Sequence, residues 1–483
     1  MKLDPFLEIE NKYSLIQDEI DGFAYWTYFR CDLKWELEQL EASCDEIYVY
    51  PKRSAWHHLK TRVESLKSAL LFGRLPRKRH DMLIFNHERR VWLEDHYECI
   101  YTDQIAQMYP DSVVLERPYF QQHYRPVKTR NLVYTDYLEI KVALVLYLER
   151  LLHKRRIEQL KERLREKISK PLEELCGIYQ ITYRADSILE KMVCGYIEYQ
   201  VKRKAFGKVL NQVRPKVILE VVGYDLDCMV INELAYERDI PTIELQHGTT
   251  GPEHIPYNYY PGTKVVQAPQ YFFAFSRFWI DVARHPMPKE RQIEIGFPYL
   301  DRRMAEVGRT VKRSVPLQII FISQYPIGKE LSDIAVTLNK IMDSEKYQIV
   351  YKLHPEEYEG WRERYPTLAA SDIKVYDDNH ADLYGLLAAS TYQIGAYCST
   401  ATFEGLAFHL KTYVLRNGAL AELKLLCEKQ LAQFFDTAEE LYRLILEDEE
   451  MPELLFQFWK INALENVRRE ISAIVKDGSI GED

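Results

Sequence analysis

Short apolar strands alternate with helices from Pro215 onward, and this alternation limits the chain to architectures built on parallel sheets. The expected strands are Lys216–Val222, Thr242–Leu245, Tyr271–Phe275 and Gln292–Ile295, followed by Leu317–Ile322, Gln348–Leu353, Ile373–Tyr376, Tyr392–Tyr397 and Thr412–Leu415. Helices are expected over Asp227–Arg238, Leu331–Met342, Ala381–Ala389 and from Ser399 to Leu410. The charged segment 301–315 is predicted to be a linker that divides these elements into two blocks. The fold class is therefore predicted to be α/β.

The part of the chain before Pro215 has a less regular pattern. Strands are expected at Glu46–Tyr50, Asp81–Phe85 and Ser112–Leu115, and the charged stretch 134–210 predicts two or three long helices. With 483 residues, the chain is long enough for two domains. We expect a first domain over 1–305 with a helical insertion at about 134–210, a second domain over 306–455, and closing helices over 456–483 that can pack back on the first domain.

Charge is unevenly distributed along the chain. The net charge of −9 argues against the binding of nucleic acid by the whole protein. The segment from Lys52 to Arg79 nevertheless holds nine basic residues and one acid, and the segment from Lys154 to Lys170 holds eight basic residues and three acids. We interpret these segments either as solvated helix faces or as surfaces that attract anionic lipid head groups or an anionic acceptor.

The eight cysteines are scattered, and none of them belongs to a CxxC pair or to a Cys/His cluster with the spacing of metal ligands. This usage fits buried thiols in a reducing compartment. Residues 1–21 lack the apolar core of a signal peptide. No apolar run approaches the ~20 residues that are needed to span a bilayer. The sequence predicts a cytoplasmic protein that makes at most a peripheral contact with the inner face of the cell membrane.

A polar turn with hydroxyl side chains follows the expected strand Tyr392–Tyr397. Ser399 stands before a helix whose apolar positions recur with a helical period, so it is a candidate N-cap. The N-terminus of a helix at the carboxyl edge of a parallel sheet can also bind an anion, through free N–H groups and the helix dipole. Ser399, Thr400 and Thr402 could then donate to a phosphate, and Glu404 could accept hydrogen bonds from ribose hydroxyls. The alternative is a capped helix without a ligand.

A second polar group ends the strand Gln348–Leu353, in the run Lys352-Leu353-His354-Pro355. The alternation of a strand places Lys352 and His354 on the same side. Together, the two side chains could contact a diphosphate or neutralise a leaving group. The alternative is a surface lysine beside a histidine that caps the next turn.

A third polar turn, Gln246-His247-Gly248, follows the strand Thr242–Leu245. A histidine in a cleft can act as a general base near neutral pH. Gly248 permits a close approach of the backbone or a positive φ. The alternative is a histidine that holds the following loop by hydrogen bonds.

The loop Thr249–Gly262 is itself a candidate for contact with a substrate, because it is long and rich in Pro, Gly and Tyr. Glu253 and His254 on this loop are further candidates for acid or base catalysis. Asp225-Leu226-Asp227 formally matches a DxD metal motif, but it precedes a helix and is better explained as an N-cap. The sequence contains no GxxxxGK[ST] loop, no GxSxG elbow and no HExxH. No metal or other cofactor is expected.

Gln-His-Gly after a strand, Lys-x-His-Pro and Ser-Thr-x-x-x-Glu, in this order, resemble the motifs of bacterial surface-polysaccharide transferases of the GT-B fold. That grouping includes capsule glycosyltransferases, polysialyltransferases, Kdo transferases and the CDP-glycerol polymerases. The resemblance covers Pro215 to Ile445 and is weaker over Asp81–Pro118. It implies two Rossmann-like domains that face each other across a cleft, with extra helices in the first domain.

The resemblance also implies which residues contact the substrates. The first domain would hold the acceptor and the second an activated donor. His354, Ser399 and Thr400 match the residues that hold the donor phosphates, Glu404 would face the nucleotide sugar, and Gln324 would lie near the donor. The full set expected on the donor side is Gln324, Lys352, His354, Ser399, Thr400, Thr402 and Glu404. The set expected on the acceptor side is His87, Arg89, Gln246 and Gly248, with His247 as the catalytic base and Glu253 and His254 as alternative candidates for acid or base catalysis.

These roles imply metal-independent transfer of a sugar from a nucleotide-sugar donor to a hydroxyl of a growing capsular or other cell-surface polysaccharide, or of a lipid-linked acceptor. His247 would remove the acceptor proton, while Lys352 and His354 stabilise the departing phosphate, and the anomeric carbon would be inverted. Three alternatives stay open: transfer of a polyol phosphate from a CDP-polyol, 2-epimerisation of a nucleotide sugar, and a non-catalytic subunit for capsule assembly.

Overall fold

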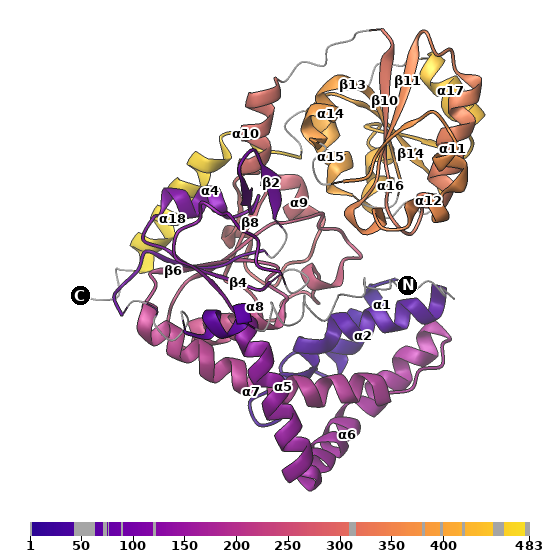
Figure 1. Cartoon of the computed structure of the whole chain (residues 1–483). Coiled ribbons are helices and arrows are strands. Elements are labelled where there is room, and N and C mark those ends of the chain that lie inside the picture. Colours follow the sequence, from indigo (N-terminus) through magenta and orange to yellow (C-terminus); the bar gives the residue numbers. More distant parts are fainter. Residues whose placement is uncertain are drawn as a thin grey trace.

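The structure is a computed structural model, and it describes residues 2–42, 63–70, 75, 77–87, 90–118, 122–308, 315–378, 382–396, 399–417, 421–447 and 458–478. The described residues form two α/β domains, and a group of long helices lies beneath the first domain in the view of Figure 1. The strand expected at Glu46–Tyr50 and the residue Arg89 lie outside the described residues, as does most of the basic segment from Lys52 to Arg79.

The first domain contains a parallel sheet. Among the described residues its strands follow the order β5-β4-β1-β6-β7-β8-β9, and each neighbouring pair is parallel. The strands are β1 (Met82–Phe85), β4 (Val113–Glu116), β5 (Leu132–Tyr134), β6 (Val217–Val221), β7 (Thr242–Leu245), β8 (Tyr271–Ala274) and β9 (Gln292–Glu294). The central strands are buried along their whole length, as expected where helices cover both faces of a sheet.

The second domain is built on another parallel sheet, with the order β12-β11-β10-β13-β14-β15 among the described residues. Its strands are β10 (Leu317–Ile322), β11 (Tyr347–Lys352), β12 (Lys374–Tyr376), β13 (Ser390–Gly395), β14 (Lys411–Leu415) and β15 (Gln433–Phe435). A short antiparallel hairpin of β2 (Val91–Leu93) and β3 (His96–Glu98) projects from the first domain. The α/β class and the arrangement of two Rossmann-like domains are thus confirmed, and this arrangement is that of the GT-B fold.

Helices cover both sheets and connect their strands. In the first domain they are α1 (Asp4–Lys12), α2 (Tyr25–Ala42), a helix over 63–70, α4 (Asp103–Met108), α5 (Asp136–Leu152), α6 (Lys154–Tyr179), α7 (Asp186–Val213), α8 (Leu226–Tyr236), η1 (Ile255–Tyr257), α9 (Arg277–Asp281), η2 (Lys289–Arg291) and α10 (Pro298–Val307). After α10 come α11 (Gly328–Ile341), η3 (Pro355–Glu357), α12 (Trp361–Arg364), α13 (Pro366–Ala369), α14 (Leu383–Ala389), α15 (Thr400–Ala407), α16 (Ala421–Glu428), α17 (Ala438–Glu447) and α18 (Ala463–Gly478).

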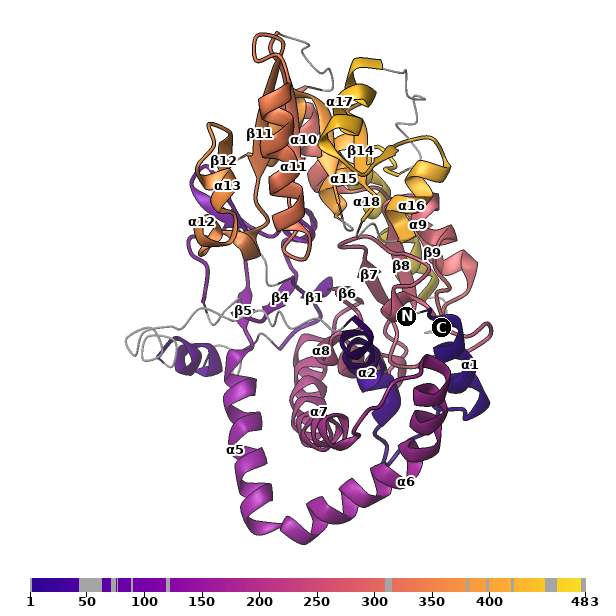
Figure 2. The same cartoon turned by 90° about the vertical axis from the view of Figure 1, so that its right-hand side faces the viewer.

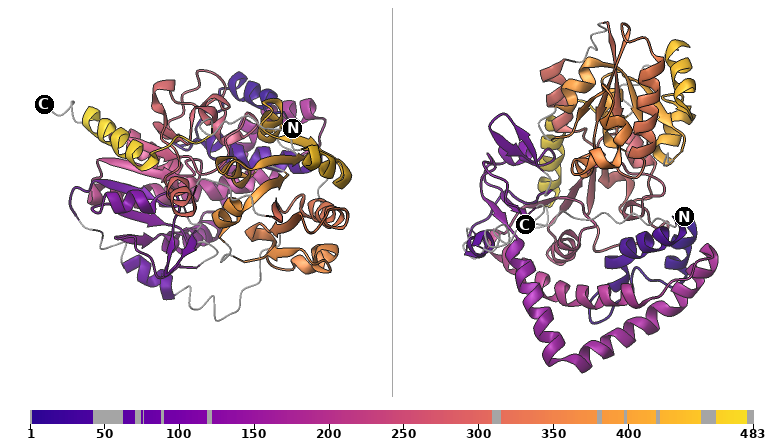
Figure 3. Two further views of the ribbon diagram at one scale, coloured as in Figure 1. Left: turned by 90° about the horizontal axis from the view of Figure 1, so that it is seen from above. Right: turned by 45° about the vertical axis from the view of Figure 1, so that its right-hand side comes forward.

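The charged stretch 134–210 forms three long helices, α5, α6 and α7, which are arranged as the three sides of a triangle (Figure 3, right). α7 packs on α8 of the first domain, α1 packs on α6, and α2 packs on α7. Buried side chains of these helices, such as Leu164, Ile188 and Phe206, share one core with Leu83 and Ile218 of the sheet. The helical group is therefore attached to the first domain through a continuous core.

Aromatic packing joins the two domains. The indole of Trp279 on α9 donates to the backbone oxygen of Phe458 at 3.0 Å, and the indole of Trp459 donates to the backbone oxygen of Phe403 on α15 at 3.0 Å. α18 then runs back along the first domain beside α4 (Figure 1), where Val467 and its neighbours are buried against the first sheet. The segment that links the second domain to α18 therefore also fixes how the two sheets face each other.

The prediction of a linker over 301–315 is wrong for residues 301–307, because these residues belong to α10. Pro298 occupies the first turn of that helix, where it needs no N–H partner, and Leu300 and Met304 on one face are buried. The many charges of this segment lie on the other face. Arg302, for example, pairs with Glu98 of β3 at 2.6 Å.

Candidate active site

The carboxyl ends of neighbouring strands bring the polar residues of the first domain together. His87 follows β1, Arg117 follows β4, Tyr224 follows β6 and His247 follows β7, and β4, β1, β6 and β7 are consecutive in the sheet. These side chains line a cavity of about 440 Å³. Thr400, at the start of α15 in the second domain, lines the same cavity. The expected cleft therefore has walls from both domains at the sheet edge where open α/β proteins bind ligands.

His247 is held in this cavity by tyrosines. Its Nε2 lies 3.3 Å from the hydroxyl of Tyr224, and its Nδ1 lies 3.3 Å from the hydroxyl of Tyr257. The hydroxyl of Tyr101 donates to the backbone oxygen of His247 at 2.6 Å. The ring of His87 lies beside it, with 5.9 Å between ring centroids. These contacts fix both the main chain and the ring plane of the expected base.

Gln246 and Gly248, on either side of His247 in the sequence, affect the backbone of the turn. Gln246 is buried, its amide donates to the oxygen of Gly248 at 2.7 Å, and its side-chain oxygen accepts from the N–H of Phe275 at 2.8 Å. Gln246 therefore holds the turn rather than an acceptor. Gly248 does not adopt a positive φ, and a Cβ at this position would have no atom within 4 Å, so the space beside its backbone is open.

Glu253 and His254 do not line the cavity. The carboxylate of Glu253 accepts from the N–H of Leu3 at 2.7 Å and so ties the N-terminal segment to the loop. Nδ1 of His254 lies 3.2 Å from the oxygen of Thr249, and burial lowers the pKa of His254 below its ordinary value. Both side chains hold the loop in place, and neither lies with His247 among the groups of the cavity.

Paired charges flank the first-domain wall. Asp225 caps α8 by accepting from the N–H of Asp227 at 3.0 Å, as expected, and it also forms an ion pair with Arg117. Burial raises the pKa of Asp225, but the charges of Arg117 and Lys202 outweigh it, so the net pKa lies below its ordinary value. Asp227 pairs with buried Lys202 at 2.7 Å. The carboxylates of the DxD run are thus held by cations of the protein.

The end of strand β6 contains a strained residue. Val222 has a φ of +63°, a conformation that a β-branched side chain rarely adopts, and it lines the cavity directly before Gly223. The N–H of Gly223 donates to Glu244 at 3.0 Å, which helps to maintain this turn. The strained turn brings Tyr224 to the side of His247.

Two glutamates lie side by side within the first sheet. Glu220 of β6 and Glu244 of β7 are register partners, and both are buried. Glu244 accepts from the hydroxyl of Tyr257 at 2.9 Å, and burial raises its pKa to about 7. Burial and the neighbouring carboxyl of Glu244 hold the pKa of Glu220 well above its ordinary value. One Glu220 oxygen accepts from Asn232 at 2.8 Å, while the other has no hydrogen-bond partner among the described residues.

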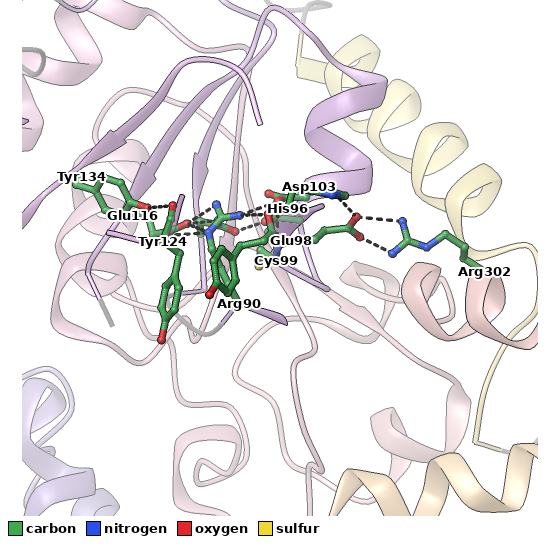
Figure 4. Close-up of polar contacts among 12 residues, drawn as sticks. Arg90, His96, Glu98, Cys99, Asp103, Glu116, Tyr124, Tyr134 and Arg302 are labelled. Atoms are coloured by element: carbon green, nitrogen blue, oxygen red, sulfur yellow. Dashed lines mark hydrogen bonds and ion pairs between the residues drawn. The ribbon is translucent and has the colours of Figure 1, made fainter. Parts of the chain in front are cut away.

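A buried arginine fixes the end of β4 (Figure 4). Arg90 donates to both carboxylate oxygens of Glu116 at 2.6 to 3.0 Å and to Asp103 at 2.8 Å. Glu116 is the last residue of β4, so this network fixes the backbone position from which the next residue, Arg117, leaves the strand. Figure 4 also shows the bidentate pair of Glu98 with Arg302, which joins the β2–β3 hairpin to α10.

In the second domain, three expected donor-side residues follow adjacent strands. Gln324 follows β10, His354 follows β11 and Ser399 follows β13, and β10 lies between the other two. Ser399 caps α15, because its hydroxyl accepts from the N–H of Ala401 at 3.3 Å. Thr400 begins the helix and faces the cavity. The predicted N-cap is therefore confirmed, and the helix N-terminus lies at the carboxyl edge of the sheet.

His354 and Lys352 have different surroundings. Nδ1 of His354 accepts from the N–H of Glu356 at 3.3 Å, and Glu357 accepts from the N–H of His354 at 2.7 Å, in a capping box at η3. An Nδ1 acceptor places the proton of the neutral ring on Nε2. Nζ of Lys352 instead bonds the hydroxyl of Tyr358 at 2.6 Å and the oxygen of Leu353 at 2.9 Å, and burial lowers its pKa to about 8. Lys352 therefore anchors the turn that positions His354.

Two expected residues lie inside α15. Thr402 is 1% exposed, and its hydroxyl oxygen has no hydrogen-bond partner among the described residues. It therefore points into the domain and not toward a donor. Glu404 is 7% exposed, and burial raises its pKa to about 7, with a hydrogen bond to Tyr384 that acts in the opposite direction.

A larger cavity of about 700 Å³ lies among α5, α6 and α7. Its walls combine apolar residues such as Ile157 and Ile197 with charged ones such as Arg163, which pairs with Asp21 at 2.9 Å. None of the residues expected at the site lines it. Among the described residues, no group of three or more His, Cys, Asp or Glu side chains is placed to hold a metal ion.

Several residues of the cavity were not predicted from the sequence. Tyr101, Arg117 and Tyr224 line the cavity, and Tyr257 contacts His247 without lining it, yet none of these residues belongs to the expected site. Arg117 directly follows a strand, and Tyr257 lies on the loop that was expected to face a substrate. A stronger signal was the single glutamate in each of two apolar strands, at Glu220 and Glu244. An acid in a strand that is buried on both faces is unusual and marks a functional neighbourhood.

No family model and no curated protein matches the chain. Similar solved structures include a UDP-GlcNAc 2-epimerase from Methanocaldococcus jannaschii, with 11% identity over 82% of this chain and 100% of that chain and a TM-score of 0.49. Acinetobacter baumannii MurG has 11% identity over 82% and 100%, with a TM-score of 0.44, and the glycotransferase of kitacinnamycin has 13% over 84% and 99%, with a TM-score of 0.42. The fold of this chain rests on its own topology, and these proteins supply no substrate for it.

Proposed function

We propose that this chain is a nucleotide-sugar-dependent glycosyltransferase that extends a cell-surface polysaccharide. The observation that carries the proposal is the shared cavity. His247, held by two tyrosines, and the N-terminus of α15 line the same space from opposite domains. A base on one side and a phosphate-binding helix start on the other are the two groups that direct glycosyl transfer requires.

On the donor side, the nucleotide phosphates bind at the start of α15. The backbone N–H groups of its first turn and the hydroxyl of Thr400 donate to the phosphate oxygens, with the helix dipole in the favourable direction. Nε2–H of His354 is a further donor, from the end of β11 on the far side of β10. Gln324 lies next to the donor, and Glu404 accepts from the ribose.

In the transfer step, Nε2 of His247 takes the proton of an acceptor hydroxyl beside Tyr224. The acceptor oxygen forms a bond with the anomeric carbon as the bond from that carbon to the phosphate oxygen breaks. The nucleotide leaves with the electron pair and is stabilised at α15, and the attack from the opposite face inverts the anomeric carbon. The proposed step uses no metal ion.

The acceptor is a growing capsular or other cell-surface chain, on a lipid or as a free oligosaccharide, and it enters from the side of His87. The protein works as a peripheral partner of the cell membrane in this proposal. No helix among the described residues is long and apolar enough to cross a bilayer.

The first experiment is a thermal-shift screen with CMP, CDP, UDP, GDP and their sugar conjugates. A nucleotide at 100 times its dissociation constant stabilises the protein by about 2.7 kcal/mol. We expect one nucleotide to raise the melting temperature of the wild type and of His247→Ala, but not that of His354→Ala. His153→Ala, which replaces an exposed histidine, is the matched control. With the matching nucleotide sugar, His247→Ala should bind but release no nucleotide in the presence of acceptor. If no nucleotide shifts the wild type, the proposal is wrong.

A further inference from the structure

The outer face of α5 carries an uncovered apolar stripe. Six large apolar side chains on this helix are exposed, by 41% to 66%: Ile140, Leu144, Tyr147, Leu148, Leu151 and Leu152. Their spacing of 4, 3, 1, 3 and 1 residues places them on one face of a helix. Exposed apolar residues that stand singly need no explanation, but a contiguous stripe marks a contact surface.

Three cations around the stripe have no ion-pair partner among the residues that the structure describes. Lys141 on α5 and Lys154 and Arg155 at the start of α6 are exposed, and they form no ion pair with any described residue. Two acids of α5 face other partners: Glu139 pairs with buried Lys202 at 3.1 Å, and Glu149 lies 3.0 Å from Nδ1 of His153. The apolar stripe is therefore bordered by free positive charge.

The rest of the basic segment from Lys154 to Lys170 differs from this border. Arg163 pairs with Asp21 at 2.9 Å, Lys167 pairs with Asp18 at 2.5 Å, and Arg165 lies 3.6 Å from Asp186. These side chains hold α6 against the N-terminal segment and α7. Of the basic segment, only the first residues therefore stay available as a docking surface.

A second exposed apolar row lies on the helix over 63–70, at the N-terminus of α5. Val63, Leu66 and Leu70 are 46%, 65% and 62% exposed, and Lys67 on the same helix is also exposed. Ser65 hydrogen-bonds with Asp136, the first residue of α5, so the two helices are joined at this point. Exposed apolar side chains and a lysine that forms no ion pair with a described residue thus recur on an adjoining element.

We propose that the outer face of α5 docks on a lipid bilayer that carries anionic head groups. Large apolar side chains on one face, with lysine and arginine at its border, are the pattern of helices that lie in a membrane interface. α5 starts directly after β5 and runs away from the first sheet along an outer side of the helical triangle (Figure 2). The second domain lies at the opposite end of the molecule in this view, so a flat surface can reach α5 without contact with that domain. The free charges match an anionic surface, whereas a second copy of this face would oppose them with like charges.

This inference builds on the membrane contact in the proposed function, and its test is independent of sugar transfer. The full chain is mixed with vesicles of phosphatidylcholine, with or without phosphatidylglycerol, and the floating fraction is measured. We expect binding to the anionic vesicles only. Leu144→Glu/Leu151→Glu should lower it at least tenfold, and Lys141→Glu/Lys154→Glu/Arg155→Glu should remove the preference for anionic vesicles.

The matched control is Leu446→Glu, which changes an equally exposed leucine on α17 of the second domain and should bind like the wild type. Circular dichroism and the nucleotide thermal shift show whether each variant is folded and keeps its donor site, so a failed docking surface is distinguished from a failed transferase. The inference is overturned if the wild type ignores anionic vesicles, or if the stripe variant floats as the wild type does. Loss of a dimer in light scattering, with unchanged flotation, would assign the face to a second copy of the chain instead.

Discussion

The hydroxyl of Tyr257 lies 3.3 Å from Nδ1 of His247. The same hydroxyl lies 2.9 Å from Glu244, so a buried carboxyl, a tyrosine and the proposed base form one chain of contacts. Tyr257 therefore positions the imidazole and couples its Nδ1 to the interior of the first sheet. A histidine whose second nitrogen is held in this way presents a fixed tautomer to its substrate.

Tyr257→Phe tests this contact, because it removes one hydroxyl and leaves the aromatic packing in place. We expect kcat for transfer to fall by about 10- to 100-fold, less than the roughly 10²- to 10⁴-fold that a general base itself contributes, because the base stays in place. KM for the donor should change little. The pH profile of kcat/KM should also move, which loss of packing alone would not cause. Tyr236→Phe, at an exposed tyrosine, is the control. An unchanged pH profile would exclude Tyr257 from the positioning of His247.

Glu244→Gln should change how stability depends on pH. Burial raises the pKa of Glu244 from 4.5 to about 7 in the folded protein. Between these values the folded state binds more protons than the unfolded state, so stability falls as pH rises through this window and is constant above it. The full effect corresponds to about 3 kcal/mol. Glutamine keeps the acceptor oxygen for Gly223 and Tyr257 but does not titrate.

The measurement for Glu244→Gln is the thermal midpoint from pH 5 to pH 8. The thermal midpoint of the wild type should fall over this range. The midpoint of the variant should depend less on pH and should exceed that of the wild type at pH 8. Glu363→Gln, at an exposed position of the second domain, should follow the wild type at every pH. Equal slopes for wild type and Glu244→Gln would mean that this carboxyl is ionised in the folded protein.

Arg90→Ala should destabilise the first domain by about 3–5 kcal/mol, because it leaves two buried carboxylates without their cation. Arg90 has a fully buried side chain, and its partners Glu116 and Asp103 are 1% and 2% exposed at the side chain. Arg302→Ala removes a pair that is 29% exposed on the arginine side and should cost less. Urea unfolding of both variants gives the comparison. A loss below about 1 kcal/mol for Arg90→Ala, the size of an exposed pair, would show that the carboxylates are protonated or solvated without it.

Local sequence patterns predicted the strands and the cap well, because each depends on a few adjacent residues. Thr242–Leu245 and Leu317–Ile322 have the expected bounds, since an apolar run ends in a polar turn at both. The strand expected at Tyr392–Tyr397 begins two residues earlier, at Ser390, because tertiary burial outweighs the polarity of Ser390 and Thr391. Leu132–Tyr134 was missed, because three residues carry no period.

The composition of the site was less predictable than its location. The carboxyl edge that holds His247, His354 and Ser399 follows from strand order alone. The direction of each side chain does not, since it depends on partners distant in sequence: Lys352 turns to Tyr358, and Thr402 lies inside its helix. The tyrosines around His247 come from three separate segments, so no local pattern could assign them.

Gly296→Ala should disturb the junction of the two domains more than an ordinary glycine replacement. Gly296 has a φ of +90°, and a Cβ there would lie 2.0 Å from the backbone oxygen of Lys460, on the segment that leads to α18. Gly262 has a similar φ of +83°, but a Cβ added there would have no atom within 4 Å, so Gly262→Ala measures the conformational cost alone. That cost is about 1–2 kcal/mol.

We expect Gly296→Ala to lower the midpoint of thermal unfolding clearly further than Gly262→Ala, because the backbone of Lys460 must move to admit the methyl group. The displacement would also reach the adjacent Trp459, whose indole bonds Phe403 of α15, and so weaken nucleotide binding at the start of that helix. The shift caused by the preferred nucleotide should therefore decrease in Gly296→Ala and stay constant in Gly262→Ala. Equal losses in the two variants would show that the junction adapts to the methyl group, and that the contact with Lys460 does not determine how the domains face each other.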